Sequence, residues 1–524
     1  MKPFSKKTSM MGLTKRLLCI GLLLALVSSA GAFSLLGPFK VGANFAGDEW
    51  QGDGYGGRPQ GLGYNLVSDI GGPMLPFEAY RWNVPILTYA FDFSFLQYFG
   101  PQGVAAVEEA IAILNALPPA SQMSATLSEF PLDIKGQNGT AATLGLFDVK
   151  SFTLSTMLEQ MGLANPERFV WNLRTRDTGT NPDFTNYTVI QLNFDPFTLQ
   201  PTRFINGVNY NYIIFDDLGP QGQEWASAVE WYQLDPLYQP YSSVAGGLGG
   251  GDFRLGSSPN LGGIFGGEGF LLPGQYYAGI TRDDAGGLRF LLSTNNIVFD
   301  TLPPTVLPRT SGVRGSPWAP VISSNIFGTN ITGISNIIGT IGTNLTNFVR
   351  TAARPGLDKI IFQRVPLFGT NFNPITLRYT DRYLNPTNGR IARQPVERLV
   401  LQPDVIFTVR DLGTVDDIPV RSRRSDTSNW TNNAAINSFL GALGLGGPGT
   451  INPPVVVFYS DMVPYFINLA VATGDVDSAL FNSGLWGSFD GTDRPPVVYP
   501  IFQHPVAPEL SLEYLRDFVL RRNN

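Results

Sequence analysis

Residues 83–95 read NVPILTYAFDFSF and decide the interpretation of the fold. β-Branched and aromatic residues dominate this stretch, which is typical of a strand. Residues 103–117 follow and predict a helix, because their apolar residues recur at helical spacing and two prolines come directly after them. This strand and this helix are the first regular elements that the sequence predicts.

Further elements are predicted along the rest of the chain. Apolar residues at helical spacing predict a helix over 151–162 that ends at Gly162, and Asn206-Gly207 predicts a hairpin within 204–215. Other predicted strands cover 187–194, 288–299, 359–365, 375–383, 398–409 and 454–459, and short helices are predicted at 432–443 and 511–521. The sequence therefore favours an α+β class that is rich in β structure.

The composition agrees with a loop-rich fold. The chain of 524 residues contains 58 Gly and 40 Pro. Charged residues are 15% of the chain, where about 25% is usual. We therefore expect long ordered Gly/Pro-rich loops, in two domains or in one large irregular domain.

The expected domain organisation follows from a proline-rich stretch at residues 301–320, which predicts a linker. The predicted parts are a signal peptide at 1–32, an N-terminal α+β domain at 33–300, the linker at 301–320, an uncharged apolar-striped segment at 321–350 and a C-terminal β-rich domain at 351–524.

The first 32 residues have the pattern of an export signal. A basic stretch precedes an apolar run over 17–27, and Ala30-Gly31-Ala32 is a cleavage site that places the mature start at Phe33. The single cysteine, Cys19, lies inside this signal, so a cysteine-free mature chain is expected, which fits a bacterial envelope or exterior. No transmembrane segment is expected in the mature chain, which would be periplasmic, cell-surface or extracellular.

Charge and histidine content exclude several functions. The formal net charge of the whole chain is −6, and removing the five basic residues of the signal from 36 leaves 31 against 42 acidic residues, or −11. Such a balance argues against a nucleic-acid partner. The chain has one histidine, His504, so a metal site with two histidines is excluded. No cofactor is predicted.

One resemblance to a known family concerns topology. Residues 87–117 resemble the opening of secreted matrixin-type metalloproteases, and the segment Leu158-Glu159-Gln160-Met161-Gly162-Leu163 lies where their zinc-binding helix would come. The positions that would carry histidine carry Leu and Gln. The resemblance therefore implies a catalytically inactive, metalloprotease-like binding domain.

Two glutamates are the candidate catalytic carboxylates. Glu224 and Glu230 lie among Trp225, Trp231 and Tyr232, and aromatic rings beside carboxylates suit a sugar site. A glycosidase needs two carboxylates and no histidine, so a polysaccharide-acting hydrolase is one hypothesis. An amphipathic helix that packs its tryptophans would produce the same pattern.

A structural calcium ion is a further hypothesis. Asp475 and Asp477 begin a D-x-D pattern of oxygen ligands at alternate positions, but Ala479 and Leu480 replace the next ligand and the turn glycine. Aspartates are also common in turns for reasons of local hydrogen bonding.

A long segment carries no charge. Residues 315–349 are 35 uncharged residues. Within them, apolar residues are spaced by four and three in alternation, as in a helical stripe: Phe327, Ile331, Ile334, Ile338, Ile341, Leu345 and Phe348. The segment is either a core-packed connector or an interaction segment for a protein partner.

These observations favour a non-enzymatic binding or structural protein over an enzyme. It would be an exported bacterial protein that acts by self-assembly or with another envelope protein, with an unidentified ligand. The alternatives are the two-carboxylate polysaccharide hydrolase and the inactive metalloprotease-like domain.

Overall fold

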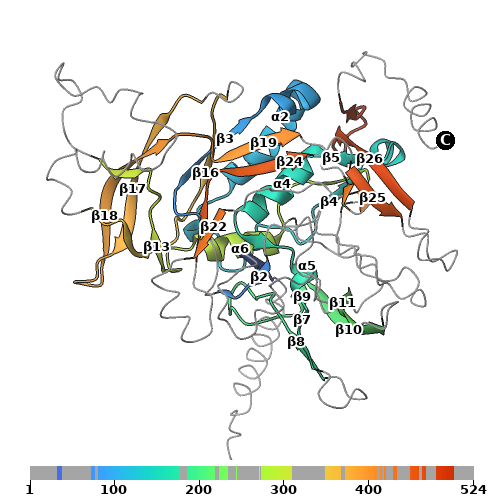
Figure 1. Ribbon diagram of the computed structural model, residues 1–524, viewed down its shortest axis with the longest axis horizontal. Coiled ribbons are helices and arrows are strands. Elements are labelled where there is room, and N and C mark those ends of the chain that lie inside the picture. The colour runs from blue at the N-terminus through green and yellow to red at the C-terminus, as the bar shows by residue number, and fades with distance from the viewer. Residues whose placement is uncertain are drawn as a thin grey trace, which may run out of the picture.

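The computed structural model describes a large part of the chain. The described residues are 32–37, 72–76, 81–177, 186–218, 224–233, 244, 271, 273–309, 348–367, 372–409, 414–415, 418–419, 429–432, 449–459, 463–467 and 480–500. This part is mixed in class, with few helices and many strands in several small sheets (Figure 1).

A four-stranded parallel sheet lies at the centre of the described chain (Figure 1). In spatial order its strands are β16 (Ile361–Arg364), β3 (Ile86–Phe91), β19 (Val405–Val409) and β24 (Val455–Tyr459). The earliest strand, β3, pairs with β16 on one side and with β19 on the other. The predicted boundary at 301–320 therefore falls between strands of the same sheet.

Helix α2 (Phe93–Ala116) follows β3 directly. Its N-cap is Asp92, whose side chain accepts a hydrogen bond from the N–H of Phe95 at 2.9 Å. The predicted helix at 103–117 is confirmed, but residues 93–95 belong to its first turn and not to the strand. The glycine-proline pair obscured this start, because Gly100 has a φ of 60° and kinks the helix just before Pro101.

Helix α4 (Val149–Gln160) confirms the helix predicted at 151–162. Gly162 follows the C-cap residue with a φ of 103°, a backbone conformation that favours glycine. Every residue of α4 except Lys150 is buried. The helix therefore lies inside the molecule and not on its surface.

Aromatic side chains join both helices to the sheet. Phe152 of α4 lies 4.9 Å from Tyr459 of β24, measured between ring centroids, and Phe95 of α2 lies 5.3 Å from the same ring. Trp486 packs on Tyr459 at 5.5 Å. Tilted and edge-to-face pairs at these distances add to the stability from burial alone.

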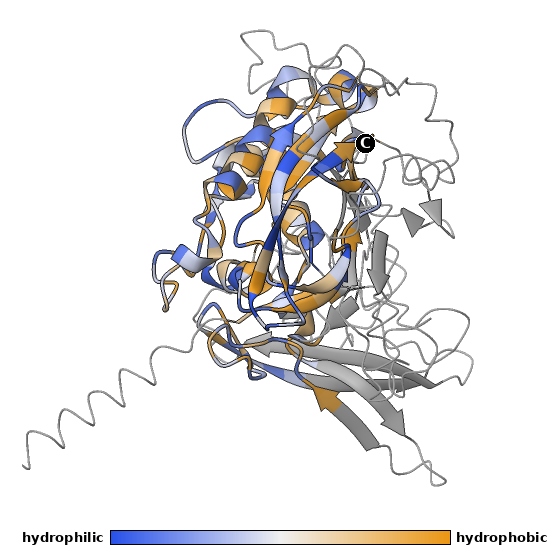
Figure 2. Cartoon of the chain, turned by 90° about the vertical axis from the view of Figure 1, so that its left-hand side faces the viewer, coloured by the Kyte–Doolittle hydropathy of each residue, from blue (hydrophilic) through white to orange (hydrophobic). Residues whose placement is uncertain are grey.

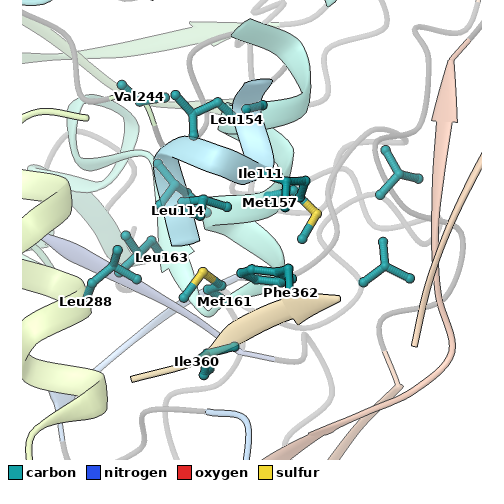
Figure 3. Packing of buried hydrophobic residues seen from close by; sticks show 14 of the residues in the cluster. Ile111, Leu114, Leu154, Met157, Met161, Leu163, Val244, Leu288, Ile360 and Phe362 are labelled. Carbon is teal, nitrogen blue, oxygen red and sulfur yellow. The ribbon is translucent and has the colours of Figure 1, made fainter. Parts of the chain in front are cut away.

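The same core continues on the other side of α4. Figure 3 shows side chains of α2, α4 and α6 (Arg282–Leu292) converging on Ile360 and Phe362 at β16. Figure 2 shows hydrophobic and hydrophilic residues interspersed along the described helices and strands. The buried apolar residues of α2, α4 and α6 belong to one core cluster.

The N-cap of α4 makes a testable prediction. Asp148 accepts a hydrogen bond from the N–H of Ser151 at 2.9 Å, and burial raises the pKa of this carboxyl to about 6. The unfolded chain releases this proton near pH 4, so the ionised carboxyl destabilises the fold increasingly from pH 4 to pH 6, by roughly 3 kcal/mol in total.

Asparagine is an equally good N-cap and does not titrate. We therefore expect Asp148→Asn to gain stability relative to the wild type as pH rises from 4 to 7, when urea unfolding of both proteins is compared at each pH. A constant difference between them across this range would contradict the prediction.

A long hairpin packs beside the parallel sheet. The predicted strand at 375–383 is confirmed as β17 (Ile375–Leu384), which pairs with β18 (Ile391–Val400). Strand β14 (Val306–Pro308) adds to β18, and β13 (Val298–Thr301) pairs with β15 (Thr351–Arg354). The described half of the predicted linker, 301–309, is thus paired in these sheets.

Two strand predictions are wrong. Residues 288–292 belong to α6 instead of a strand, because Thr281 and Asp284 form a capping box that starts this helix, and β13 begins afterwards. Residues 398–409 form the end of β18 and the whole of β19, with a turn between them. Apolar runs alone did not reveal that these segments change direction.

The hairpin predicted within 204–215 is confirmed, and it turns at Asn206-Gly207, where both residues have positive φ. The remaining strands form small sheets: β1 (Ser34–Gly37), β2 (Gly72–Met74), β4 (Lys135–Gln137), β5 (Leu146–Asp148), β6 (Leu163–Ala164), β7 (Asn172–Asp177), β8 (Asn186–Ile190), β9 (Phe204–Ile205), β10 (Val208–Leu218), β11 (Glu224–Gln233), β12 (Gln275–Tyr277), β20 (Thr414–Val415), β21 (Ile418–Pro419), β22 (Asn429–Asn432), β23 (Gly449–Asn452), β25 (Val463–Ile467), β26 (Leu480–Ser488) and β27 (Val497–Val498). Short helical turns are η3 (Ala120–Gln122), α3 (Gly139–Thr143) and α5 (Pro166–Phe169).

The predicted strands near 187, 359 and 454 correspond to β8, β16 and β24, with β8 ending at Ile190. Of the helix predicted at 432–443, only Asn432 is described, and it ends β22; the remainder and the helix predicted at 511–521 lie outside the described residues. Among the residues that the structure describes, no helix combines the length and apolar character needed to cross a membrane.

Candidate functional site

A cavity of about 150 Å³ lies between the residues that precede β3, the ends of β13 and β15, and the middle of β17. It is lined by Arg81, Trp82, Asn83, Pro85, Asp300, Arg354, Pro355, Gly356, Leu357, Tyr379, Thr380, Asp381 and Arg382. Segments that are nearly 300 residues apart in the chain thus meet around one space.

Arg354 organises the charged wall of the cavity. Its Nε donates to Asp381 Oδ1 at 3.0 Å, and its Nη1 donates to Asp300 Oδ1 at 3.2 Å. All three side chains are buried, with 3–5% of each exposed. The planar guanidinium can serve two carboxylates at once, so this arrangement requires arginine and not lysine.

Asp381 is also fixed from a second strand. Gln394 of β18 donates from Nε2 to Asp381 Oδ2 at 2.7 Å and to the carbonyl of Val349 at 2.7 Å. The amide oxygen of Gln394 accepts from the N–H of Val349 at 3.0 Å. The carboxylate therefore cannot swing out of the cavity wall without breaking several hydrogen bonds.

Arg81 is the less completely paired cation. It donates to the carbonyls of Asn296 and Arg354 at 2.6 and 2.7 Å, but its nearest carboxylate oxygen, on Asp300, lies 3.7 Å away. Burial lowers the pKa of Arg81 to about 10, against the opposing effect of Asp300. The guanidinium therefore remains charged at neutral pH.

Tyr379 provides the one buried side-chain polar group without a partner that we identify among the described residues of the cavity wall. Its hydroxyl is buried and has no hydrogen-bond partner. Burial, and secondarily the charge of Asp381, raises the pKa of Tyr379, so the hydroxyl stays protonated. A buried hydroxyl without a partner costs about 1–3 kcal/mol, and a ligand or water with an acceptor oxygen would remove that cost.

The charges of the lining residues are not balanced. The lining contains the buried Arg81 and Arg354, the solvent-exposed Arg382, and two buried carboxylates, Asp300 and Asp381. The cavity wall therefore carries an excess of one positive charge and favours a ligand with an acceptor or anionic group over a cation.

Sequence reasoning did not identify this site. Its charged residues are single arginines and aspartates spread over strands, without a motif or a fixed spacing. A usable signal was present in β17, where Leu377, Tyr379 and Asp381 share one face and exposed residues alternate with them.

The predicted carboxylate pair lies elsewhere. Glu224 and Glu230 belong to β11, whereas the alternative reading had placed them in a helix, and their side chains lie outside the described part of the structure. Six residues along a strand span about 20 Å, whereas glycosidase carboxylates lie about 5 to 9.5 Å apart. This spacing argues against a joint catalytic role.

The other predicted site residues lie mostly outside the described residues. This applies to Asp475, Asp477 and His504, and to the apolar stripe from Phe327 to Leu345. Its last member, Phe348, is half-buried against the main core, and the guanidinium of Arg350 lies 5.3 Å from the centre of its ring. The end of the stripe therefore contacts this chain itself.

Within the described ranges, no group of three or more His, Cys, Asp or Glu side chains could hold a metal ion. Comparison with protein-family models, with curated proteins and with solved structures finds no match to this chain. The function therefore has to be argued from the cavity itself.

Proposed function

We propose that this is an exported, non-enzymatic bacterial protein that binds a small polar ligand in the cavity around Arg354. The observation that supports it is the buried hydroxyl of Tyr379, which has no hydrogen-bond partner and belongs to a residue of the cavity lining. The export signal at residues 1–32, the periplasmic or extracellular location and the finer α+β class with one or two domains are parts of the same proposal.

The size of the cavity limits the ligand. A cavity of about 150 Å³ accommodates a molecule of about the size of benzene, whereas drug-sized ligands need about 300–1,000 Å³. The ligand, or the part of it that enters, therefore has about six non-hydrogen atoms.

The charges of the wall define the chemistry of the ligand. An acceptor oxygen would take the proton of the Tyr379 hydroxyl, and a negative charge would compensate the excess arginine. We therefore propose a small carboxylate, with a neutral amide as a weaker ligand.

Three probes of the same shape test this order of affinity. Acetate, acetamide and acetamidinium carry charges of −1, 0 and +1. We expect acetate to bind more tightly than acetamide, and acetamidinium not to bind, when chemical shifts of the protein are followed during titration. Binding of acetamidinium alone, or of none of the three, would contradict the proposal.

The variant Tyr379→Phe tests the hydroxyl itself. We expect it to weaken acetate binding about fivefold, the effect of losing one hydrogen bond of about 1 kcal/mol, without loss of stability in the absence of ligand. Tyr383→Phe, in the same strand but outside the cavity lining, is the matched control and should leave binding unchanged. Equal affinities in the two variants would exclude Tyr379 as a ligand contact.

A further inference from the structure

The first residues that the structure describes at the N-terminal side, starting with Ala32, are buried. Ala32 is 0% exposed, and Phe33, Ser34, Leu35 and Leu36 after it are also buried. Phe33 stacks on Phe290 of α6, with ring centroids 5.5 Å apart, and β1 lies between β2 and β6. The first described residues are therefore an integral part of the core.

The N–H of Ala32 points at a buried carboxylate. It donates to Oδ1 of Asp283 at 2.6 Å, and the N–H of Asn206 donates to Oδ2 at 2.7 Å. Asp283 lies in the first turn of α6 and is 0% exposed. Both oxygens of this carboxylate are thus served by backbone groups.

Within the described part of the chain, Asp283 forms no ion pair. The neighbouring Arg282 acts on this carboxylate through space, but its Nε is directed to the carbonyl of Phe130 at 3.4 Å. Burial, with a smaller effect of Asp284, raises the pKa of Asp283 well above its usual range. A buried charge without a counter-charge is strongly destabilising, so a positive group at the position of the Ala32 nitrogen would stabilise the fold.

The sequence offers a way to create that positive group. Leader peptidases require small residues at the first and third positions before the cleaved bond. Gly31 and Ser29 satisfy this requirement for cleavage before Ala32, one residue earlier than the predicted boundary before Phe33.

We propose that a leader peptidase cleaves between Gly31 and Ala32, and that the new α-ammonium of Ala32 forms a buried ion pair with Asp283. In this step water is added across the peptide bond. The hydroxyl of water completes the carboxyl group of Gly31, and the nitrogen of Ala32 takes up protons to become the ammonium. This inference rests on the export half of the proposed function and is independent of the ligand.

Cleavage one residue later, before Phe33, would leave the new ammonium without a carboxylate partner. The new ammonium would be the nitrogen of Phe33, whose N–H donates to the carbonyl of Phe194 at 2.9 Å. That position is buried and offers a carbonyl instead of a carboxylate. In addition, Asp283 would lose the donor at Ala32.

The first experiment is N-terminal sequencing of the full chain after export from a bacterial host. We expect the mature protein to begin at Ala32. A start at Phe33, or at any other residue, would overturn the inference. Recovery of only the uncleaved chain would overturn both this inference and the export half of the proposed function, whereas acetate titration would still test the ligand half.

The second experiment measures the ion pair in the exported protein. We expect Asp283→Asn to shift the equilibrium toward the unfolded state about a hundredfold or more, because the buried ammonium of Ala32 would lose its counter-charge. The matched control is Asp195→Asn, because Asp195 is also buried and accepts from the N–H groups of Phe197 and Thr198.

The control variant should shift the equilibrium less than about tenfold, because the amide oxygen of asparagine can accept hydrogen bonds from the same two N–H groups. Equal effects of the two variants would overturn the ion pair. If Asp283→Asn does not fold, the N-terminal sequence of the exported wild-type chain decides whether the inference holds.

Discussion

Replacing Asp404 with alanine is expected to lower the free energy of unfolding by about 3–5 kcal/mol, the effect of breaking a buried ion pair. Asp404 precedes β19 and is 0% exposed, and its carboxylate pairs with Arg398 of β18. It also accepts from the N–H and the hydroxyl of Thr88 in β3, at 2.8 and 3.0 Å. The substitution would leave the guanidinium of Arg398 buried without its counter-charge.

The matched control is the exposed pair of Glu108 and Arg364, whose side chains are 39% and 51% exposed. Glu108→Ala should cost less than about 1 kcal/mol, because water screens such pairs. Urea unfolding of the three proteins measures both effects. A loss in Asp404→Ala no larger than that in Glu108→Ala would show that the pair does not fasten the hairpin to the parallel sheet.

Arg354→Ala is expected to destabilise the protein by a similar amount, about 3–5 kcal/mol at pH 7. The substitution removes the cation that lies between Asp300 and Asp381 and leaves two carboxylates buried side by side. The Arg354 guanidinium also donates to the carbonyl of Val349, so the residues just before β15 would lose a hydrogen bond as well.

The loss of stability in Arg354→Ala should increase as pH rises. Burial already raises the pKa of Asp300 in the folded protein, against the effect of Arg81 and Arg354, and removing Arg354 raises it further. When the pKa of an acid is higher in the folded than in the unfolded protein, the free energy of unfolding falls as pH rises. We therefore expect the deficit of Arg354→Ala relative to wild type to be smaller at pH 4 than at pH 7.

Arg350→Ala is the control for this variant. Arg350 is half-buried four residues away and donates to the carbonyls of Leu302, Pro303 and Val306. Its removal leaves no charge unpaired, so we expect a loss of about 1–2 kcal/mol without the same pH dependence. A pH-independent loss in Arg354→Ala would contradict the assignment of the two buried carboxylates.

The sequence predicted the elements that depend on local patterns. Helical spacing and the proline stop identified most of α2, and Gly162 identified the end of α4. Asn206-Gly207 located a hairpin turn because both residues tolerate positive φ. Each of these signals acts within a few residues, so it survives in a single sequence.

The errors arose where helix-capping residues outweigh the strand preference of aromatic and apolar runs. Residues 288–292 are apolar enough for a strand, but the capping box at Thr281 and Asp284 starts a helix that includes them. The first turn of α2 resembled a strand because aromatic residues suit both states, and the N-cap at Asp92 decided between them.

By itself, the sequence excluded some kinds of site and determined several local elements. One histidine excludes a two-histidine metal site, and the spacing of apolar residues determines the two main helices. Only the tertiary structure decided which charges meet. Arg81, Asp300, Arg354, Tyr379 and Asp381 come from separate segments. No local pattern relates them, because the energy of a buried charge depends on the neighbours that the whole fold brings to it.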